Sequence, residues 1–366
     1  MEKKKIGIIT FHQALNYGAV LQAYALKAVC DEMGYETHIV DYNYGGIDEK
    51  VAPIAKFMAT KDKVSAIPAL LRGILGYVGD KKREDAFLSF RKKYLNESIE
   101  CFSAEDIDSL EYDILIAGSD QIWNRGITKD CYDPVFFMNF CTRARKVLYG
   151  ASSEDVPFGG EKEEEFKHAL STMEGTVSIR EQKLADYVEI LIGKSYQVVI
   201  DPTLLAGRDI IDSIVTKEVP RDPYILLYQI DSNPESDICI KNLEERFGCA
   251  VYTMSVPRIG NTHGRRGEVG PEEFLAFLKG AKFLVTNSFH GIALSLIYEK
   301  QFYVYENGGV MSRIDGLLGQ LDLMNRKVKM VADISLDNCI DYVPVNCVLQ
   351  NLRQVSREFL IQALDG

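Results

Sequence analysis

The chain has 366 residues, a formal net charge of −11 and 46% hydrophobic residues. This length and apolar content predict a large core and favour two domains over one. The acidic balance argues against a general nucleic-acid-binding protein, which would more often carry a basic surface. The start of the chain predicts a first strand and no signal peptide. No apolar run approaches the roughly 20 residues of a membrane span, so we expect at most peripheral membrane contact.

The first elements predict a βαβ unit. Residues 5–10 have the pattern of a strand, residues 19–33 show the apolar spacing of a helix, and residues 37–41 form the next strand. This order predicts a parallel sheet with helices on its faces. Residues from about 47 to 100 then look inserted, and they predict a helical hairpin with a solvated basic face. A surface that touches a membrane carrying a lipid-linked substrate is the alternative.

The same alternation of strand and helix begins again after a stretch from 201 to 223 that contains three prolines. We therefore predict an α/β protein with two Rossmann-like domains that face each other across a cleft. The predicted divisions are an N-terminal domain over 1–205 that contains the insertion, a C-terminal domain over 206–350, and a final helix within 351–366 that packs back on the first domain.

Polar residues stand at the ends of four predicted strands. Ligands of open parallel sheets bind at the carboxyl ends of the strands, so clusters in both halves fit a cleft better than chance. The clusters are Asn16-Tyr17-Gly18, Ser119-Asp120, Arg180-Glu181 and Ser288-Phe289-His290-Gly291.

The cluster that ends at Gly291 is the strongest candidate for chemistry. It lies between a predicted buried strand over 282–286 and the apolar run 292–297, which places His290 in the first turn of a helix. Such a junction presents free backbone N–H groups and the positive end of the helix dipole, and it binds anions. A histidine at that point can hold or give a proton beside a bound phosphate or carboxylate.

The other clusters have plainer alternatives. A buried ion pair with Glu181 or Asp201 is the alternative for Arg180, and a cap of the following turn is the alternative for Asp120. Asn16 could serve only a turn. No GxGxxG motif follows the first strand and no phosphate-binding GxxxxGK[ST] loop occurs, which weakens a dinucleotide-binding interpretation. The eight cysteines form no CxxC pair, so we expect no metal site and reduced thiols, as in the cytoplasm.

Together, these motifs resemble those of the polysaccharide pyruvyl transferases, in family order over nearly the whole chain. The resemblance implies a GT-B-like pair of Rossmann-like domains and no cofactor. It implies transfer of a pyruvyl group from phosphoenolpyruvate to a sugar of a cell-surface polysaccharide or its precursor, forming a pyruvate ketal in the cytoplasm or at the inner membrane surface. The matching segments are Asn16 to Leu26, Gly118 to Asn124, Val177 to Gln182, Asp201 to Leu205 and Thr286 to Gly291.

The resemblance assigns the active-site histidine to His290 and a donor-holding arginine to Arg180. Some members carry a basic residue directly before the Phe/Leu-His pair, where this chain has Ser288. We therefore expect the donor to rely more on the backbone N–H groups from Ser288 to Gly291. Basic side chains that could add to them are Arg258, Arg265, Lys300 and Arg313.

For the acceptor, we expect Asp120 to orient or deprotonate a sugar hydroxyl, with Asn16, Tyr17 and Ser119 in contact with the sugar. The acceptor sugar, and whether it is lipid-linked, stay open. Two alternative functions also stay open: a GT-B-type glycosyltransferase that uses a nucleotide sugar, and a non-catalytic glycan-binding protein.

Overall fold

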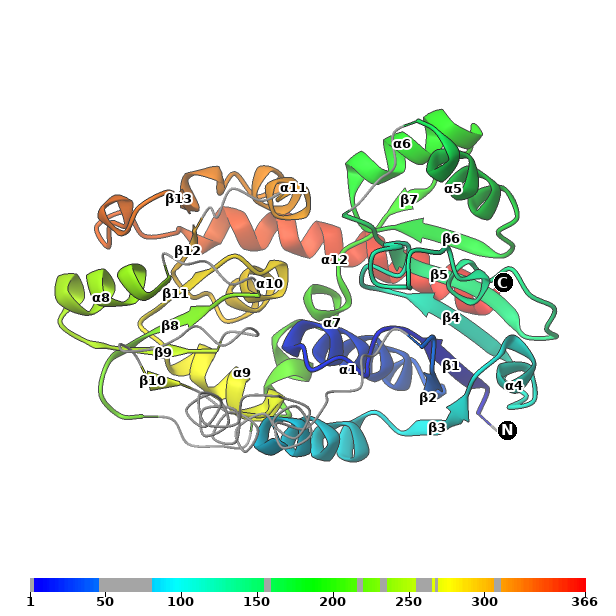
Figure 1. Ribbon diagram of the computed structural model, residues 1–366, viewed down its shortest axis with the longest axis horizontal. Coiled ribbons are helices and arrows are strands. Elements are labelled where there is room, and N and C mark those ends of the chain that lie inside the picture. The colour runs from blue at the N-terminus through cyan, green and yellow to red at the C-terminus, as the bar shows by residue number, and fades with distance from the viewer. Residues whose placement is uncertain are drawn as a thin grey trace, which may run out of the picture.

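The structure is a computed structural model that describes residues 3–45, 81–154, 159–215, 220–230, 236–254, 265–266, 269–305 and 311–366. Two parallel sheets form two halves of the molecule, and helices pack between them (Figure 1). None of the described helices combines the length and the apolar character that crossing a membrane requires.

The first half is built on a seven-stranded parallel sheet in the order β3-β2-β1-β4-β5-β6-β7. Its central strands are apolar and buried, as expected for a parallel sheet covered by helices on both faces. The strands are β1 (Lys5–Ile9), β2 (Glu36–Tyr42), β3 (Glu97–Cys101), β4 (Ile114–Gly118), β5 (Arg145–Ala151), β6 (Thr176–Ile179) and β7 (Gln197–Val198). The helices are α1 (Tyr17–Glu32), residues 81–94, α4 (Ala104–Asp108), η1 (Pro134–Phe137), α5 (Glu161–Ser171), α6 (Gln182–Ile192) and α7 (Pro202–Asp212).

The second half repeats this plan with a six-stranded parallel sheet in the order β10-β9-β8-β11-β12-β13. Its strands are β8 (Tyr224–Tyr228), β9 (Ala250–Thr253), β10 (Arg265–Arg266), β11 (Phe283–Thr286), β12 (Phe302–Tyr305) and β13 (Lys327–Val328). Its helices are α8 (Ser236–Phe247), α9 (Pro271–Gly280), α10 (Phe289–Ile297), α11 (Ser312–Gln320), η2 (Met324–Arg326), η3 (Val331–Asp333) and α12 (Tyr342–Asp365).

A shared apolar core joins the halves. α7 packs against α1 of the first half and α10 of the second, and the ring of Tyr17 stacks on Phe274 of α9 with centroids 4.2 Å apart. Figure 1 shows α12 running from the second half across to the first. There Ser356 Oγ accepts a hydrogen bond from the Ile200 N–H at 2.9 Å, and Arg145 Nη1 donates to the Leu364 carbonyl at 2.7 Å. These contacts fix the strand ends of one half against those of the other.

The α/β class and the pair of Rossmann-like sheets are as predicted. Two boundaries differ. The expected insertion stops before 100, because Glu97–Cys101 form the edge strand β3 beside β2. The last helix begins at Tyr342 and not near 351, because Asp341 caps it by accepting a hydrogen bond from the Val343 N–H. Residues 46–80 of the insertion lie outside the described residues, and the domain boundary at 205 stays a prediction.

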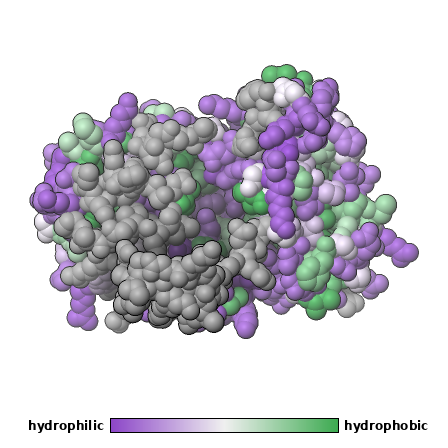
Figure 2. All heavy atoms as spheres, viewed as in Figure 1, coloured by the Kyte–Doolittle hydropathy of each residue, from purple (hydrophilic) through white to green (hydrophobic). Residues whose placement is uncertain are grey.

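Each sheet has one point where the strand order reverses, between β1 and β4 in the first and between β8 and β11 in the second. Ligands of open α/β sheets bind outside the carboxyl ends of the strands at such points. The segments that follow these strands carry Asn16 and Asp120 in the first half and His290, in the first turn of α10, in the second. Figure 2 shows the surface hollowed between the two halves.

Candidate functional site

The site centres on the start of α10. Ser288 is the N-cap of this helix, where its Oγ accepts a hydrogen bond from the Gly291 N–H at 3.3 Å and its own N–H donates to Thr286 Oγ1 at 3.0 Å. A Cβ atom on Gly291 would lie 2.6 Å from Thr286 Oγ1, so glycine lets α10 pack closely on β11. Ser288 and Gly291 therefore bond to each other at the helix start, and their direct contact with a donor stays a prediction. Within the described chain, the N–H groups of Phe289 and His290 keep no acceptor.

His290 stands where the two halves meet. Its side chain is almost fully buried, and a Cβ atom on Gly18 of α1 would overlap the imidazole at Nδ1. Its Nε2 lies 3.4 Å from Asp201 Oδ2, an ionic contact that does not form a hydrogen bond in this geometry. Hydrogen bonds of catalytic groups often shorten only when substrate is bound.

Asp201 is the carboxylate that holds this region together. It caps α7, and its Oδ1 accepts hydrogen bonds from the Thr203 N–H at 2.9 Å and from Thr203 Oγ1 at 2.6 Å. Burial alone raises the pKa of Asp201, but His290, Arg180 and Thr203 outweigh it and hold the pKa well below the usual range. Asp201 is thus an ionised carboxylate beside the imidazole of His290.

Arg180 has a protein acceptor for each guanidinium nitrogen. Nε donates to Glu181 Oε1 at 2.8 Å, Nη1 to Asp201 Oδ2 at 2.9 Å and Nη2 to Ser152 Oγ at 2.8 Å. Burial alone lowers the pKa of Arg180, but the Glu181 and Asp201 carboxylates reverse this and raise it. The buried ion pair is therefore the observed arrangement, and a bidentate contact from Arg180 to a donor does not fit it.

Arg313, in the first turn of α11, reaches the same place from the second half. Its Nη2 donates to Glu154 Oε2 at 3.0 Å, across to the loop that follows β5. The guanidinium carbon of Arg313 lies 5.8 Å from the centre of the Phe289 ring, and that of Arg180 lies 4.8 Å from it. Two cationic groups thus contact the first residue of α10.

Three buried nitrogen atoms around this helix start have no hydrogen-bond partner among the described residues. They are Asn287 Nδ2, His290 Nε2 and Arg313 Nε. Buried polar groups in native proteins are almost always paired, so each exception needs an explanation. All three can act as hydrogen-bond donors. The backbone N–H groups of Phe289 and His290 at the same helix start are donors without acceptors as well. The cluster is suited to a ligand rich in acceptor oxygens, such as a phosphate or a carboxylate.

Asp120 lies at the point where the strand order of the first half reverses. It follows β4 with a left-handed φ of +62°, after Gly118 with φ of +122°, where a Cβ atom would overlap the Tyr149 carbonyl oxygen. Burial raises the pKa of the Tyr228 hydroxyl, and the Asp120 carboxylate is among the charges that add to this effect.

The expected acceptor residues are engaged elsewhere. Asn16 Oδ1 accepts from the Gly18 and Ala19 N–H groups as the cap of α1, and Ser119 Oγ donates to the Gly150 carbonyl at 3.0 Å. Tyr17 is fully buried between the halves, where its hydroxyl donates to the Val269 carbonyl at 2.9 Å. The structure shows Asn16 in the local structural role that the sequence analysis gave as the alternative. Sugar contacts by Ser119 and Tyr17 do not fit this packing.

The basic side chains that were expected to add to donor binding lie in different places. Lys300 lies beyond the C-terminal end of α10, where its Nζ donates to the Ala281 carbonyl at 3.0 Å, so it is at the wrong end of the helix to meet a donor beside His290. Arg258 and the side chain of Arg265 lie outside the described residues. Of this group, the structure brings Arg313 to the α10 start.

Sequence reasoning missed two carboxylates. Asp201 was considered only as a partner of Arg180, although its place between an apolar run and Pro202 is a sequence signature of a helix start at a strand end. No pattern singles out Glu154, because its role depends on Arg313, which is distant in the chain. No group of three or more His, Cys, Asp or Glu side chains among the described residues is arranged to hold a metal ion, and the expectation that no metal is essential stays a prediction.

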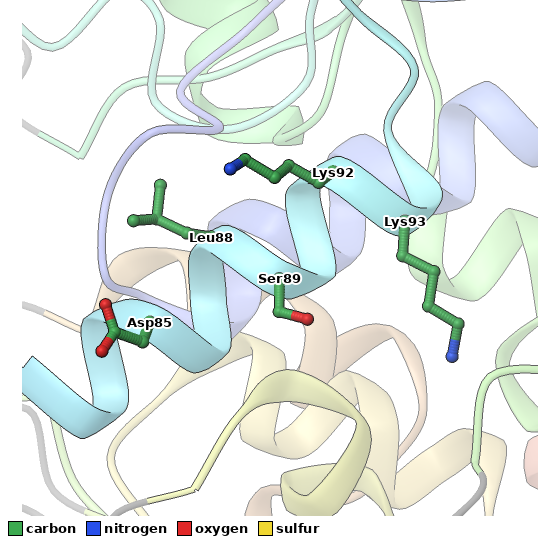
Figure 3. Close-up of a pocket in the computed structure, with 5 residues that line it drawn as sticks. All are labelled: Asp85, Leu88, Ser89, Lys92 and Lys93. Atoms are coloured by element: carbon green, nitrogen blue, oxygen red, sulfur yellow. The ribbon is translucent and has the colours of Figure 1, made fainter.

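A separate pocket lies away from this cluster. Figure 3 shows it on the helix over 81–94, lined by Asp85, Leu88, Ser89, Lys92 and Lys93. The lining residues all come from one helix face, and none belongs to the strand ends described above. The pocket therefore adds nothing to the site at α10.

Comparisons with known proteins agree with this architecture. The chain is similar to the UDP-N-acetylglucosamine 2-epimerase from Rickettsia bellii, with a TM-score of 0.51, 8% identity, and coverage of 100% of this chain and 98% of the other. It also aligns with the spinosyn rhamnosyltransferase SpnG, with a TM-score of 0.47, 8% identity, and coverage of 99% and 100%. At such identities the likeness to the epimerase shows the fold alone.

A search of curated proteins gave no match. The sequence model of the polysaccharide pyruvyl transferases matches residues 16–309, a range that contains Arg180, Asp201 and His290. The match covers well over half of the chain, and the chain belongs to the polysaccharide pyruvyl transferase family.

Proposed function

We propose that this protein transfers a pyruvyl group from phosphoenolpyruvate to a sugar of a cell-surface polysaccharide or its precursor, forming a pyruvate ketal. The observation that carries the proposal is the set of unpaired buried donors on Asn287, His290 and Arg313 around the α10 start. Phosphoenolpyruvate offers a phosphate and a carboxylate to such a set. Family membership supports this donor over other anions.

The reaction needs a proton donor and two sugar hydroxyls. Protonation of the enol CH2 gives a methyl group and an oxocarbenium-like carbon, to which the two hydroxyl oxygens add in turn. The C–O bond to phosphate breaks, and inorganic phosphate leaves. Of the two hydroxyl protons, one balances the proton now in the methyl group and the other leaves with the phosphate.

His290 supplies the first proton in this proposal. The ionised Asp201 carboxylate, 3.4 Å from Nε2, orients the ring. Arg180 acts as a positioning residue, because it holds Asp201 through a buried 2.9 Å contact.

The anionic groups of the donor bind between the N–H groups at the α10 start and the guanidinium of Arg313. A helix start stabilises negative charge, and a guanidinium binds carboxylate or phosphate in a fixed geometry. Asp120, from the facing half, orients or deprotonates the acceptor hydroxyl. The reaction takes place in the cytoplasm, or at the inner membrane surface if the acceptor is lipid-linked.

Asp120 and the donor site can be separated experimentally. We expect Asp120→Asn to lower turnover or raise the KM of the acceptor, with donor affinity nearly unchanged. Calorimetry with phosphoenolpyruvate and a turnover assay would measure both. Collapse of donor affinity in this variant would place Asp120 in the donor site and contradict the division of the cleft proposed here.

Donor binding tests the function itself. Calorimetry should show binding of phosphoenolpyruvate and no competing binding of UDP or CMP. With a suitable acceptor, phosphorus NMR should show release of inorganic phosphate and carbon NMR a new ketal carbon. Tight binding of UDP without phosphoenolpyruvate would instead indicate a nucleotide-sugar glycosyltransferase, and glycan binding with no donor at all would indicate a binding protein.

A further inference from the structure

We propose that Glu154 determines the donor affinity of this site, because its carboxylate binds Arg313 and has to leave when the donor anion binds. The inference rests on the proposed function for the identity of the donor. It goes beyond that function in two respects. It identifies the Glu154 carboxylate as an anion of the chain that competes with the donor for Arg313. It also means that donor binding breaks the ion pair between the two halves.

The Glu154–Arg313 pair joins the two halves directly. Arg313 Nη2 and Glu154 Oε2 are 3.0 Å apart, with the arginine side chain 8% exposed and the glutamate side chain 28% exposed. The pair thus stands at the solvent boundary of the site, with its cation inside and its anion nearer to water. A carboxylate in that place can move outward at a smaller desolvation cost than a buried one.

The Glu154 carboxylate forms a hydrogen bond with one nitrogen of the Arg313 guanidinium and leaves Nε without a partner. Nε and Nη2 form the edge with which arginine binds a carboxylate or phosphate through two parallel hydrogen bonds. Glu154 takes Nη2, while the buried Nε has no partner among the described residues. An incoming anion that accepts from both atoms would therefore form a better contact than Glu154 forms now.

Two other buried arginines show the contrast. Arg125 donates from Nε to Asp130 at 2.8 Å and from Nη1 to Glu165 at 2.7 Å, and its Nη2 donates to the Asp130 carbonyl. Arg180 is satisfied in the same way by its three acceptors.

Buried Arg83 also leaves its Nε without a partner, but that guanidinium lies over the rings of Tyr17 and Phe87. Arg313 combines an unpaired Nε with a place beside the first residue of α10, which is what a ligand-binding arginine requires.

The position of Arg313 fits the donor. Its guanidinium stands against the ring of Phe289, the first residue of α10. The N–H groups of Phe289 and His290 have no acceptor in the described chain. His290 follows directly. An anion that displaces Glu154 from Arg313 thus also reaches the helix start and the imidazole, and its binding releases one ionic contact between the halves.

The test removes the competing charge and keeps the shape. Glu154→Gln should bind phosphoenolpyruvate and inorganic phosphate about threefold to tenfold more tightly than the wild type, as measured by calorimetry. Arg313→Met should weaken both by more than about tenfold, and the gain from Glu154→Gln should vanish in the double variant. Glu165→Gln is the matched control, because it neutralises the partner of another buried arginine, Arg125, which has no contact with Arg313 or the α10 start, and it should leave both affinities unchanged.

The outcomes separate this inference from the proposed function. Phosphoenolpyruvate binding that Glu154→Gln does not improve overturns the inference and leaves the function standing. If Glu154→Gln binds inorganic phosphate more tightly but no variant binds phosphoenolpyruvate, the result supports the inference and contradicts phosphoenolpyruvate as the donor. An equal gain from Glu154→Gln with and without Arg313 also overturns the inference, because the effect would then be general electrostatics.

Discussion

The two points where strand order reverses occupy equivalent places in their sheets, yet their polar residues do different things. In the first half, Asn16 caps α1 and Ser119 donates to the sheet, so these side chains are satisfied within the fold. In the second half, Asn287 and His290 keep buried atoms without partners. A polar strand end therefore marks where a ligand could bind, and the unsatisfied donors mark the strand end at which we propose that the donor binds.

This difference has an energetic consequence. A buried polar group with a partner contributes to folding, so its loss should appear as a lower free energy of unfolding. A buried polar group without a partner costs stability until a ligand binds it, so its loss should appear mainly in binding or turnover. Substitutions in the two regions should thus change different measurements.

The largest expected effect is on turnover at the second region. His290→Ala should lower turnover by on the order of 10² to 10⁴-fold through loss of the proton donor, with little loss of unfolding free energy. Turnover with a verified acceptor and urea denaturation would measure the two quantities. A variant that retains turnover would show that the unpaired Nε2 has no part in the chemistry.

His290→Gln refines this result. Glutamine keeps a hydrogen-bond donor but cannot give a proton at neutral pH. We expect it to retain donor binding and to remain as slow as the alanine variant. Turnover close to the wild type would mean that His290 only positions the donor and that the acid lies elsewhere.

Asp201 belongs to both regions, since it supports His290 and also anchors Arg180. Asp201→Asn should lower the free energy of unfolding by about 3–5 kcal/mol, because it removes one partner of a buried ion pair and leaves Arg180 undercompensated. Urea denaturation at neutral pH would show this. A loss of turnover without a loss of stability would instead make Asp201 a residue of the site alone.

The same carboxylate predicts a pH dependence. The pKa of Asp201 is lower in the folded protein than in the unfolded chain, so its stabilisation is complete above the usual carboxyl value of about 4 and is lost as pH falls towards the folded pKa. The stability difference between wild type and Asp201→Asn should therefore be constant near neutral pH and shrink below about pH 4. A difference that grows on acidification contradicts this assignment.

The sequence was sufficient for the fold and for the place of the site. Apolar strands alternating with helices predict parallel sheets, and the Ser288 to Gly291 segment predicts a helix start with His290 in its first turn. What the sequence could not show is which polar groups are already satisfied. The partners of Arg180 and Arg313 come from other elements, at Asp201 and Glu154, and only tertiary packing brings them within hydrogen-bond distance.

Gly18 joins the two regions and allows a sharper test. It lies in the first turn of α1 and leaves room for the His290 ring, which a Cβ atom would overlap. Gly18→Ala should therefore cost about 1–3 kcal/mol of stability by overpacking and should also lower turnover by displacing the imidazole. This cost opposes the helix propensity of alanine, which by itself favours the variant.

Gly316→Ala is the matched control for that effect. Gly316 lies in α11 with an ordinary helical backbone, and a Cβ atom there would meet nothing within 4 Å. Alanine at that position should stabilise the protein by up to about 1 kcal/mol, as in any open helical site. Equal effects at the two glycines would show that His290 does not lie against Gly18 in solution.

The smallest expected effect returns to the first region. Asn16 Oδ1 accepts from the Gly18 and Ala19 N–H groups, at 2.8 and 3.4 Å, and so caps α1. Asn16→Ala should lower the free energy of unfolding by about 1 kcal/mol, the usual cost of a lost cap. Asn16→Asp is the matched variant, since aspartate caps as well and its charge favours a helix start, so it should keep the stability. If Asn16→Ala instead raises the KM of the acceptor and leaves stability unchanged, Asn16 binds the sugar, and the contrast between a satisfied first region and an unsatisfied second region fails.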